Sequence, residues 1–206
     1  MTQTNGDNSL LGQRLKLLLI FILFASPVLA AWIWNANIER WRPTTKTNHG
    51  ELITPARPLG ALNLPQLDGK PLATDFLRGK WTLVYIGPAA CDKDCQESLY
   101  VMRQVRLALN EKMERVQRLW IISDAQSSPR LAVLLSDYPG LAVARPQAAA
   151  RDAVLTAFKG PGPGPVEDRI YIMDPLGNLM MRYPTKVDAK GLLKDVQRLL
   201  LTSWVG

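Results

Sequence analysis

Residues 81–95 read WTLVYIGPAACDKDC, and this stretch decides the class of fold. Its first seven residues are rich in β-branched and aromatic side chains and end at Gly87-Pro88, which favours a buried strand. Two cysteines follow, at positions 91 and 95, where apolar residues begin to recur at helical spacing. Chemistry-bearing residues between a strand and a helix indicate an α/β domain with its site at the carboxyl end of a strand.

The same alternation of strands and helices extends through the rest of the domain. A turn is expected at Asp68-Gly69, because Asp-Gly tolerates positive φ, and a loop is expected at the GPGPGP of 160–165. We therefore expect an α/β domain over residues 59–206 with helices on the faces of its sheet. The pattern predicts strands at 59–64, 81–87, 116–123, 141–144, 169–173 and 179–183, and helices at 94–113, 129–138, 148–158 and 188–202.

An uncharged run, LLLIFILFASPVLAAWIW, occupies residues 17–34. Spanning a bilayer takes roughly 17 to 25 apolar residues, so this run is long enough to cross one. Tryptophans gather at its far end, as they do at membrane interfaces. We expect a cytoplasmic tail over 1–13, a transmembrane anchor over 14–34 and a linker over 35–58.

Removal of this segment on export is an open alternative. Val28-Leu29-Ala30 before Ala31 is typical of a signal-peptidase site. The rest of the chain has no second apolar run of that length, so it lies on one side of the membrane. Both interpretations place the domain outside the cytoplasm, and we expect a single-pass protein of the inner (cytoplasmic) membrane with its C-terminal domain in the periplasm.

Composition excludes several classes of protein. The 206 residues include two cysteines and one histidine, too few for a disulfide-dense scaffold or a four-ligand structural zinc site. The 25 Lys and Arg exceed the 18 Asp and Glu, and basic residues concentrate between 103 and 118. That cluster is either a solvated helix face or a contact for anionic lipid headgroups or an acidic partner. Nucleic acid is not an expected partner of an extracytoplasmic domain.

Cys91 and Cys95 are the candidate site residues. A helix N-terminus favours thiolate over thiol, whereas Asp92 and Asp94 oppose deprotonation and Lys93 only partly offsets them. At i, i+4 spacing the two sulfurs can form a disulfide or converge on one soft ion, for which Cu(I) is the tentative choice. A passive disulfide and two unrelated buried thiols are the alternatives.

The segment WTLVYIGPAACDKDCQESL, together with LDGKPL, WIISDA and IYIMDPLGNLMMRYP, resembles the Sco/SenC branch of the thioredoxin superfamily over about residues 59–204. This resemblance implies a thioredoxin-like (Sco/peroxiredoxin-type) fold and a membrane-anchored protein that helps assemble the copper centre of cytochrome c oxidase. Cys91 and Cys95 match the family's thiol pair. The implied partners are a cytochrome c oxidase subunit or a copper chaperone.

Two departures from the family pattern bear on function. Asp92 replaces the usual proline after the first cysteine, and the family's ligand histidine would fall at about Val166, although residues 50–206 contain no histidine. His49 is either a solvated linker residue or a ligand supplied by a linker that folds back. We expect a thiol–disulfide oxidoreductase, a Cu(I) handler, or both. The alternative is a non-catalytic scaffold with a structural disulfide, and peroxide reduction lacks the Pro/Thr/Arg surroundings it needs.

Overall fold

The computed structural model describes residues 6–38, 47–60, 62–73, 75–160 and 164–203, in two units that divide after residue 46. In the first unit, helix α1 spans Gly6–Ala36. Its segment Gln13–Ala36 has 24 residues and a mean hydropathy of 2.4. At a rise of about 1.5 Å per residue it extends about 36 Å, more than the roughly 30 Å core of a bilayer. By length and composition the predicted apolar helix is confirmed, and a signal sequence would share these properties.

The second unit is built on one six-stranded mixed sheet, with strand order β1-β6-β5-β2-β3-β4. The central strand β2 pairs in parallel with β3 and antiparallel with β5. Strand β4 adds in parallel to β3, and β6 and β1 add antiparallel on the other side. The strands are β1 Glu51–Pro58, β2 Trp81–Gly87, β3 Val116–Ile122, β4 Leu141–Ala144, β5 Arg169–Met173 and β6 Asn178–Arg182.

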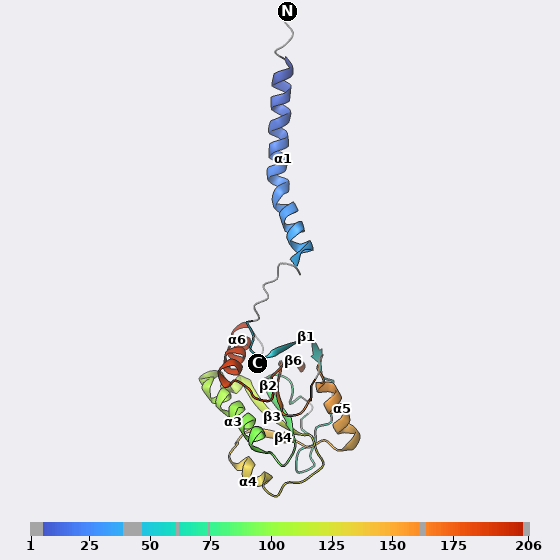
Figure 1. Cartoon of the computed structure of the whole chain (residues 1–206), viewed down its shortest axis with the longest axis vertical. Helices are drawn as coiled ribbons and strands as arrows, with labels where there is room; N and C mark the ends of the chain where they lie inside the picture. Colours follow the sequence, from blue (N-terminus) through green and yellow to red (C-terminus); the bar gives the residue numbers. More distant parts are fainter. Residues whose placement is uncertain (1–5, 39–46, 61, 74, 161–163, 204–206) are drawn as a thin grey trace, which may run out of the picture. The chain divides into compact units, whose positions relative to one another are not determined.

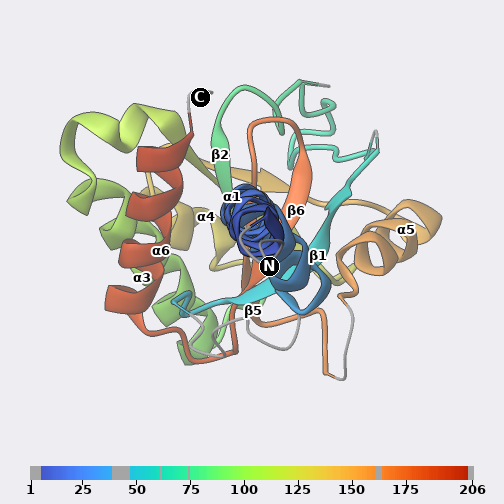
Figure 2. The same cartoon turned by 90° about the horizontal axis from the view of Figure 1, so that it is seen from above.

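Helices cover both faces of this sheet (Figure 2). On one face α3 and α6 enclose a core that contains Leu83, Tyr85 and Trp120, and on the other α5 encloses a core around Phe158 and Tyr171. All seven residues of β2 are buried, which explains why it reads as a continuous apolar run. The helices are α3 Lys93–Ala108, the 3₁₀ turn η1 Asn110–Arg115, α4 Leu131–Ser136, α5 Ala148–Phe158 and α6 Ala189–Thr202 (Figure 1).

This architecture confirms the predicted α/β class and most of the predicted elements. The Asp68-Gly69 turn is confirmed too, because Gly69 has φ +82° and the Gln66 amide donates to the Lys70 carbonyl over 2.7 Å. The central part of the GPGPGP loop, 161–163, lies outside the described residues, as do residues 1–5 of the predicted tail and 39–46 of the predicted linker.

The predicted linker includes a strand of the sheet. Strand β1, within 35–58, pairs antiparallel with β6. The Arg182 guanidinium joins the two strands by donating to Glu51 from Nε over 2.6 Å and from Nη2 over 2.9 Å. Ile53, a residue of β1, is buried in the core that contains Phe158 and Tyr171. The prolines of β1 interrupt the alternation of apolar and polar residues by which a strand is recognised in a sequence. A strand tolerates proline only where its backbone pairing is incomplete.

Two other predicted elements differ from the structure. The described residues of 59–64 lie outside the six strands: the Leu59 amide donates to the Gly177 carbonyl, and the Leu64 carbonyl accepts from the Leu72 amide. The helix predicted to reach 113 ends at Ala108 and continues as η1. Asn110, with φ +50°, interrupts the helical path, a conformation that asparagine tolerates better than most residues.

Candidate functional site

The end of β2 and the start of α3 place both cysteines at one edge of the sheet. Cys91 has φ +37°, so the chain turns sharply there before α3 begins. Asp92 is the N-cap of α3, and its carboxylate accepts a hydrogen bond from the Cys95 amide over 3.0 Å. Where the family pattern has proline, this chain has a residue that satisfies a helix N-terminal donor, which supplies a reason for the departure.

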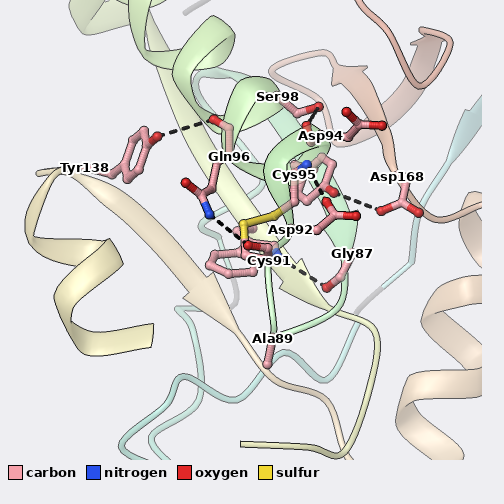
Figure 3. Close-up of a disulfide and its surroundings, with 12 residues drawn as sticks. Gly87, Ala89, Cys91, Asp92, Asp94, Cys95, Gln96, Ser98, Tyr138 and Asp168 are labelled. Atoms are coloured by element: carbon pink, nitrogen blue, oxygen red, sulfur yellow. Dashed lines mark hydrogen bonds between the residues drawn. A yellow bond between two sulfur atoms is a disulfide. The ribbon is translucent and has the colours of Figure 1, made fainter. Parts of the chain in front are cut away.

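Cys91 and Cys95 are joined by a disulfide, with their Cα atoms 5.1 Å apart (Figure 3). Cys91 is 3% exposed and Cys95 1% exposed. The Gln96 side-chain amide donates to the Cys91 carbonyl over 3.0 Å, and the Tyr138 hydroxyl donates to the Gln96 carbonyl over 3.3 Å. These bonds tie the disulfide loop to α3 and to the segment that follows α4.

An open groove of about 590 Å³ reaches the disulfide on the Cys91 side. Cys95 does not line this groove, so a reacting group that enters it meets Cys91 first. The lining residues come from the disulfide loop and from α4 and its approach: Ala89, Ala90, Cys91, Gln96, Ser128, Pro129, Arg130, Leu131, Val133, Leu134 and Asp137.

A tyrosine–carboxylate pair lies near the disulfide, with Tyr85 on strand β2 and Asp168 directly before strand β5. The Tyr85 hydroxyl donates to the Asp168 carboxylate over 3.0 Å. Burial raises the pKa of Tyr85, and the charge of Asp168 raises it further. Asp168 has φ +57°, and its amide donates to the Ile86 carbonyl. This hydroxyl therefore stays protonated at every physiological pH, and it is a donor beside the site.

Neither position considered for a third copper ligand brings an imidazole to the cysteines. Val166 packs against the core on the α5 face. His49 lies against α6, where its Nδ1 is 3.3 Å from the Asp195 carboxylate. Within the described residues, no three His, Cys, Asp or Glu side chains are grouped to hold a metal ion.

The segment around His49 docks on the domain, which corrects its interpretation as a freely solvated linker residue. Asp195, 3% exposed, accepts hydrogen bonds from the His49 amide over 2.8 Å and from the Gly50 amide over 2.9 Å. It also accepts one from the Tyr183 hydroxyl over 2.8 Å. A side chain at Gly191 would collide with His49, since a Cβ there would lie 2.8 Å from the imidazole carbon Cγ. We call this attachment of residues 49 and 50 to Asp195 the clamp. The sequence allowed a linker that folds back but could not identify its partner, because Asp195 is about 145 residues away.

Comparisons with known proteins agree with this geometry. Residues 81–203 match the model of a family described as "transmembrane-like, thioredoxin-like, C-terminal domain". No curated protein matches the chain. Solved structures do match, and because each is less than 25% identical they show the fold, which confirms the predicted thioredoxin-like arrangement.

Sco proteins are among the solved structures that match. Copper-bound Sco1 of yeast is 19% identical over 77% of this chain and 96% of its own, with a TM-score of 0.58. Apo Sco1 of Thermus thermophilus is 18% identical over 76% and 99%, with a TM-score of 0.61. BsSco, described as a Sco-family cytochrome c oxidase assembly protein with a disulfide switch, is 14% identical over 74% and 100%, with a TM-score of 0.53.

Proposed function

From the premise that this chain belongs to the transmembrane-like, thioredoxin-like family, we propose that it is a membrane-anchored thiol–disulfide exchange protein. One observation carries the proposal: a Cys91–Cys95 disulfide at the first turn of α3, with Cys91 lining an open groove. The positive end of α3 favours a thiolate at this site, whereas Asp92 at the N-cap and Asp94 in the first turn oppose it.

In the exchange, the reduced chain acts through both cysteines in turn. The Cys91 thiolate attacks one sulfur of a partner disulfide, a mixed disulfide forms, and the partner's other sulfur leaves as a thiolate. The Cys95 thiolate then attacks Cys91, which forms the intramolecular disulfide and releases the partner's second thiolate. The partner gains two electrons, the chain loses two, and a thiol reductant restores the chain's dithiol.

The proposed setting is assembly of the cytochrome c oxidase copper centre. The support is the fold shared with proteins described as copper-bound Sco1 and as Sco-family oxidase assembly proteins. The partner would present the cysteine pair of an oxidase subunit or of a copper chaperone. In this proposal α1 is a single-pass anchor in the inner membrane, and the domain lies in the periplasm.

The residues present do not fit the three-ligand copper site that the resemblance implies. The histidine position is Val166, and His49 is engaged by Asp195 on α6. Only the two sulfurs remain as soft ligands, and two thiolates suit Cu(I) rather than Cu(II). Copper therefore takes no part in the proposed exchange, and Cu(I) binding by the reduced cysteine pair is a separate proposal.

The burial of both sulfurs favours a second candidate, a scaffold that docks oxidase subunits or assembly factors around a structural disulfide. Equilibration of the full chain with thiol redox buffers, followed by trapping of free thiols, separates the two functions. The disulfide of an exchange protein should be half reduced at a redox potential that cellular thiol pools can reach. A structural disulfide stays oxidised until the redox potential falls below about −300 mV. Replacing Cys95 with serine adds a second test, because Cys91 should then accumulate as a mixed disulfide with a peptide that carries a disulfide.

A further inference from the structure

Helix α6 carries cations along the side that faces away from the core. Lys190, Lys194 and Arg198 recur every four residues and are exposed. Leu201, 72% exposed, lies on the same side, because eleven residues complete about three helical turns from Lys190. We call these four residues the α6 cationic face. Clusters of Lys and Arg on a helix are attracted to anionic lipid headgroups.

The positive charge of this face is not neutralised by its own helix. Residues 188–202 contain two acids. Asp188 is the N-cap and accepts from the Lys190 and Gly191 amides, and Asp195 is buried beneath the clamp. In the part of the chain that the structure describes, neither Lys190 nor Lys194 forms an ion pair.

The basic cluster noted in the sequence at 103–118 is a poorer docking surface. Arg118 is 3% exposed and donates to the Pro139 carbonyl, so it is not the solvated residue that we expected. Arg106 is engaged by Glu114 and by the Val116 carbonyl. Some cations of the 103–118 cluster are therefore engaged in contacts within the domain, whereas the α6 cationic face remains an accessible basic stripe.

The cationic face lies where the chain enters the domain. Arg198 donates from Nη1 to the Thr47 carbonyl over 3.0 Å, and Asp195 holds the next two residues of the chain. Ten residues, 37–46, separate the end of α1 from Thr47. Ten residues reach at most about 35 Å, so the connection between α1 and Thr47 is short.

We propose that the α6 cationic face docks on the anionic phospholipid headgroups of the membrane that holds α1. The inference rests on the anchoring part of the proposed function and goes beyond it, because it assigns a second, peripheral contact. Each cation near an anionic surface increases the bound population about fivefold, and screening by salt weakens the effect. Leu201 adds a small apolar contact at one end of the stripe.

A fluorescence experiment on the full chain in lipid nanodiscs tests the proposal. Gln197, exposed between the lysines and Leu201, is replaced by cysteine and labelled with an environment-sensitive dye while the native disulfide stays oxidised. Quenching by neutral acrylamide is compared in phosphatidylcholine discs and in discs with one-third phosphatidylglycerol. We expect at least threefold weaker quenching in the anionic discs, and loss of the difference in high salt.

Charge reversal supplies the variant and its matched control. Lys190→Glu with Lys194→Glu should restore strong quenching in anionic discs, whereas Arg78→Glu with Lys80→Glu, the same charge change at exposed positions before β2, should not. Equal quenching in both lipids, or an equal effect of the two double variants, overturns the docking proposal.

Membrane insertion is measured separately, by extraction of native membranes with alkaline carbonate. Release of the full-length chain would refute the anchor and this inference together. Retention with lipid-independent quenching would refute the inference alone and leave the anchor standing.

Discussion

Asp195 is the residue on which the attachment of residues 49 and 50 to α6 depends. Its buried carboxylate accepts hydrogen bonds from the His49 and Gly50 amides and from the Tyr183 hydroxyl, at 2.8 to 2.9 Å. Replacing Asp195 with alanine leaves two buried donors, the Gly50 amide and the Tyr183 hydroxyl, without an acceptor. Each unsatisfied buried donor costs about 1 to 3 kcal/mol. We expect Asp195→Ala to lower the free energy of unfolding by about 3 to 5 kcal/mol.

Asparagine at position 195 keeps the shape of the side chain and removes its charge. Its amide oxygen can still accept hydrogen bonds, but these become neutral, and bonds to a charged acceptor are worth about 1 kcal/mol more each. Because three bonds are affected, Asp195→Asn should cost about 2 to 3 kcal/mol. The exposed neighbour Lys194→Ala should change stability by less than about 0.5 kcal/mol and serves as the control.

Urea unfolding of the full chain in detergent micelles, followed by tryptophan fluorescence, measures these differences. The urea midpoint should fall in the order wild type and Lys194→Ala, Asp195→Asn, Asp195→Ala. Tyr183→Phe combined with Asp195→Ala should cost less than the sum of the single changes, because the two residues share a hydrogen bond. An Asp195→Ala loss below about 1 kcal/mol would refute the clamp as a stabilising element.

Four further outcomes are expected. Replacing Cys91 and Cys95 together with serine should leave the far-ultraviolet circular dichroism native while abolishing thiol exchange, because so short a loop contributes little unfolded-state entropy; a double variant that unfolds would favour the scaffold. The reduced domain should bind Cu(I) and not Cu(II) by equilibrium dialysis, lose Cu(I) in either single serine variant and keep it in His49→Ala, whereas Cu(II) binding lost in His49→Ala would contradict this. Burial raises the pKa of Tyr171 to about 12, so its native state prefers the protonated form and stability should fall as the pH rises above 10; absorbance at 295 nm should show Tyr171 ionising near pH 12 in the folded chain, and a normal titration near 10 would refute this. A reporter fused after Gly206 should be active in the periplasm, and activity only in the cytoplasm would overturn the location.

Local patterns in the sequence were sufficient for the central elements of the fold. The run at 81–87 predicts its strand because both faces of β2 are covered and every position favours an apolar or β-forming side chain. Helix α6 is predicted equally well, since its apolar stripe repeats at 3.6 residues over four turns. The cysteine spacing predicts that the two sulfurs can meet, because that geometry is set within one helical turn.

Tertiary structure decided the features that depend on residues far apart in the chain. Strand β1 exists because β6 pairs with it and Arg182 reaches Glu51, and its proline-rich sequence carries no strand signal. The position of His49 is likewise set by Asp195 on a helix near the other end of the chain.

The charge of a side chain can be read from sequence, but its exposure cannot. Arg118 and Lys194 are both cations in amphipathic surroundings, and folding buries the first and exposes the second. Sequence by itself determined most of the helices and strands and where the reactive sulfurs lie, because propensity and spacing act over a few residues. Which partner each element meets, and so which charges remain at the surface, was decided only when distant segments packed together, because burial is a property of the whole fold.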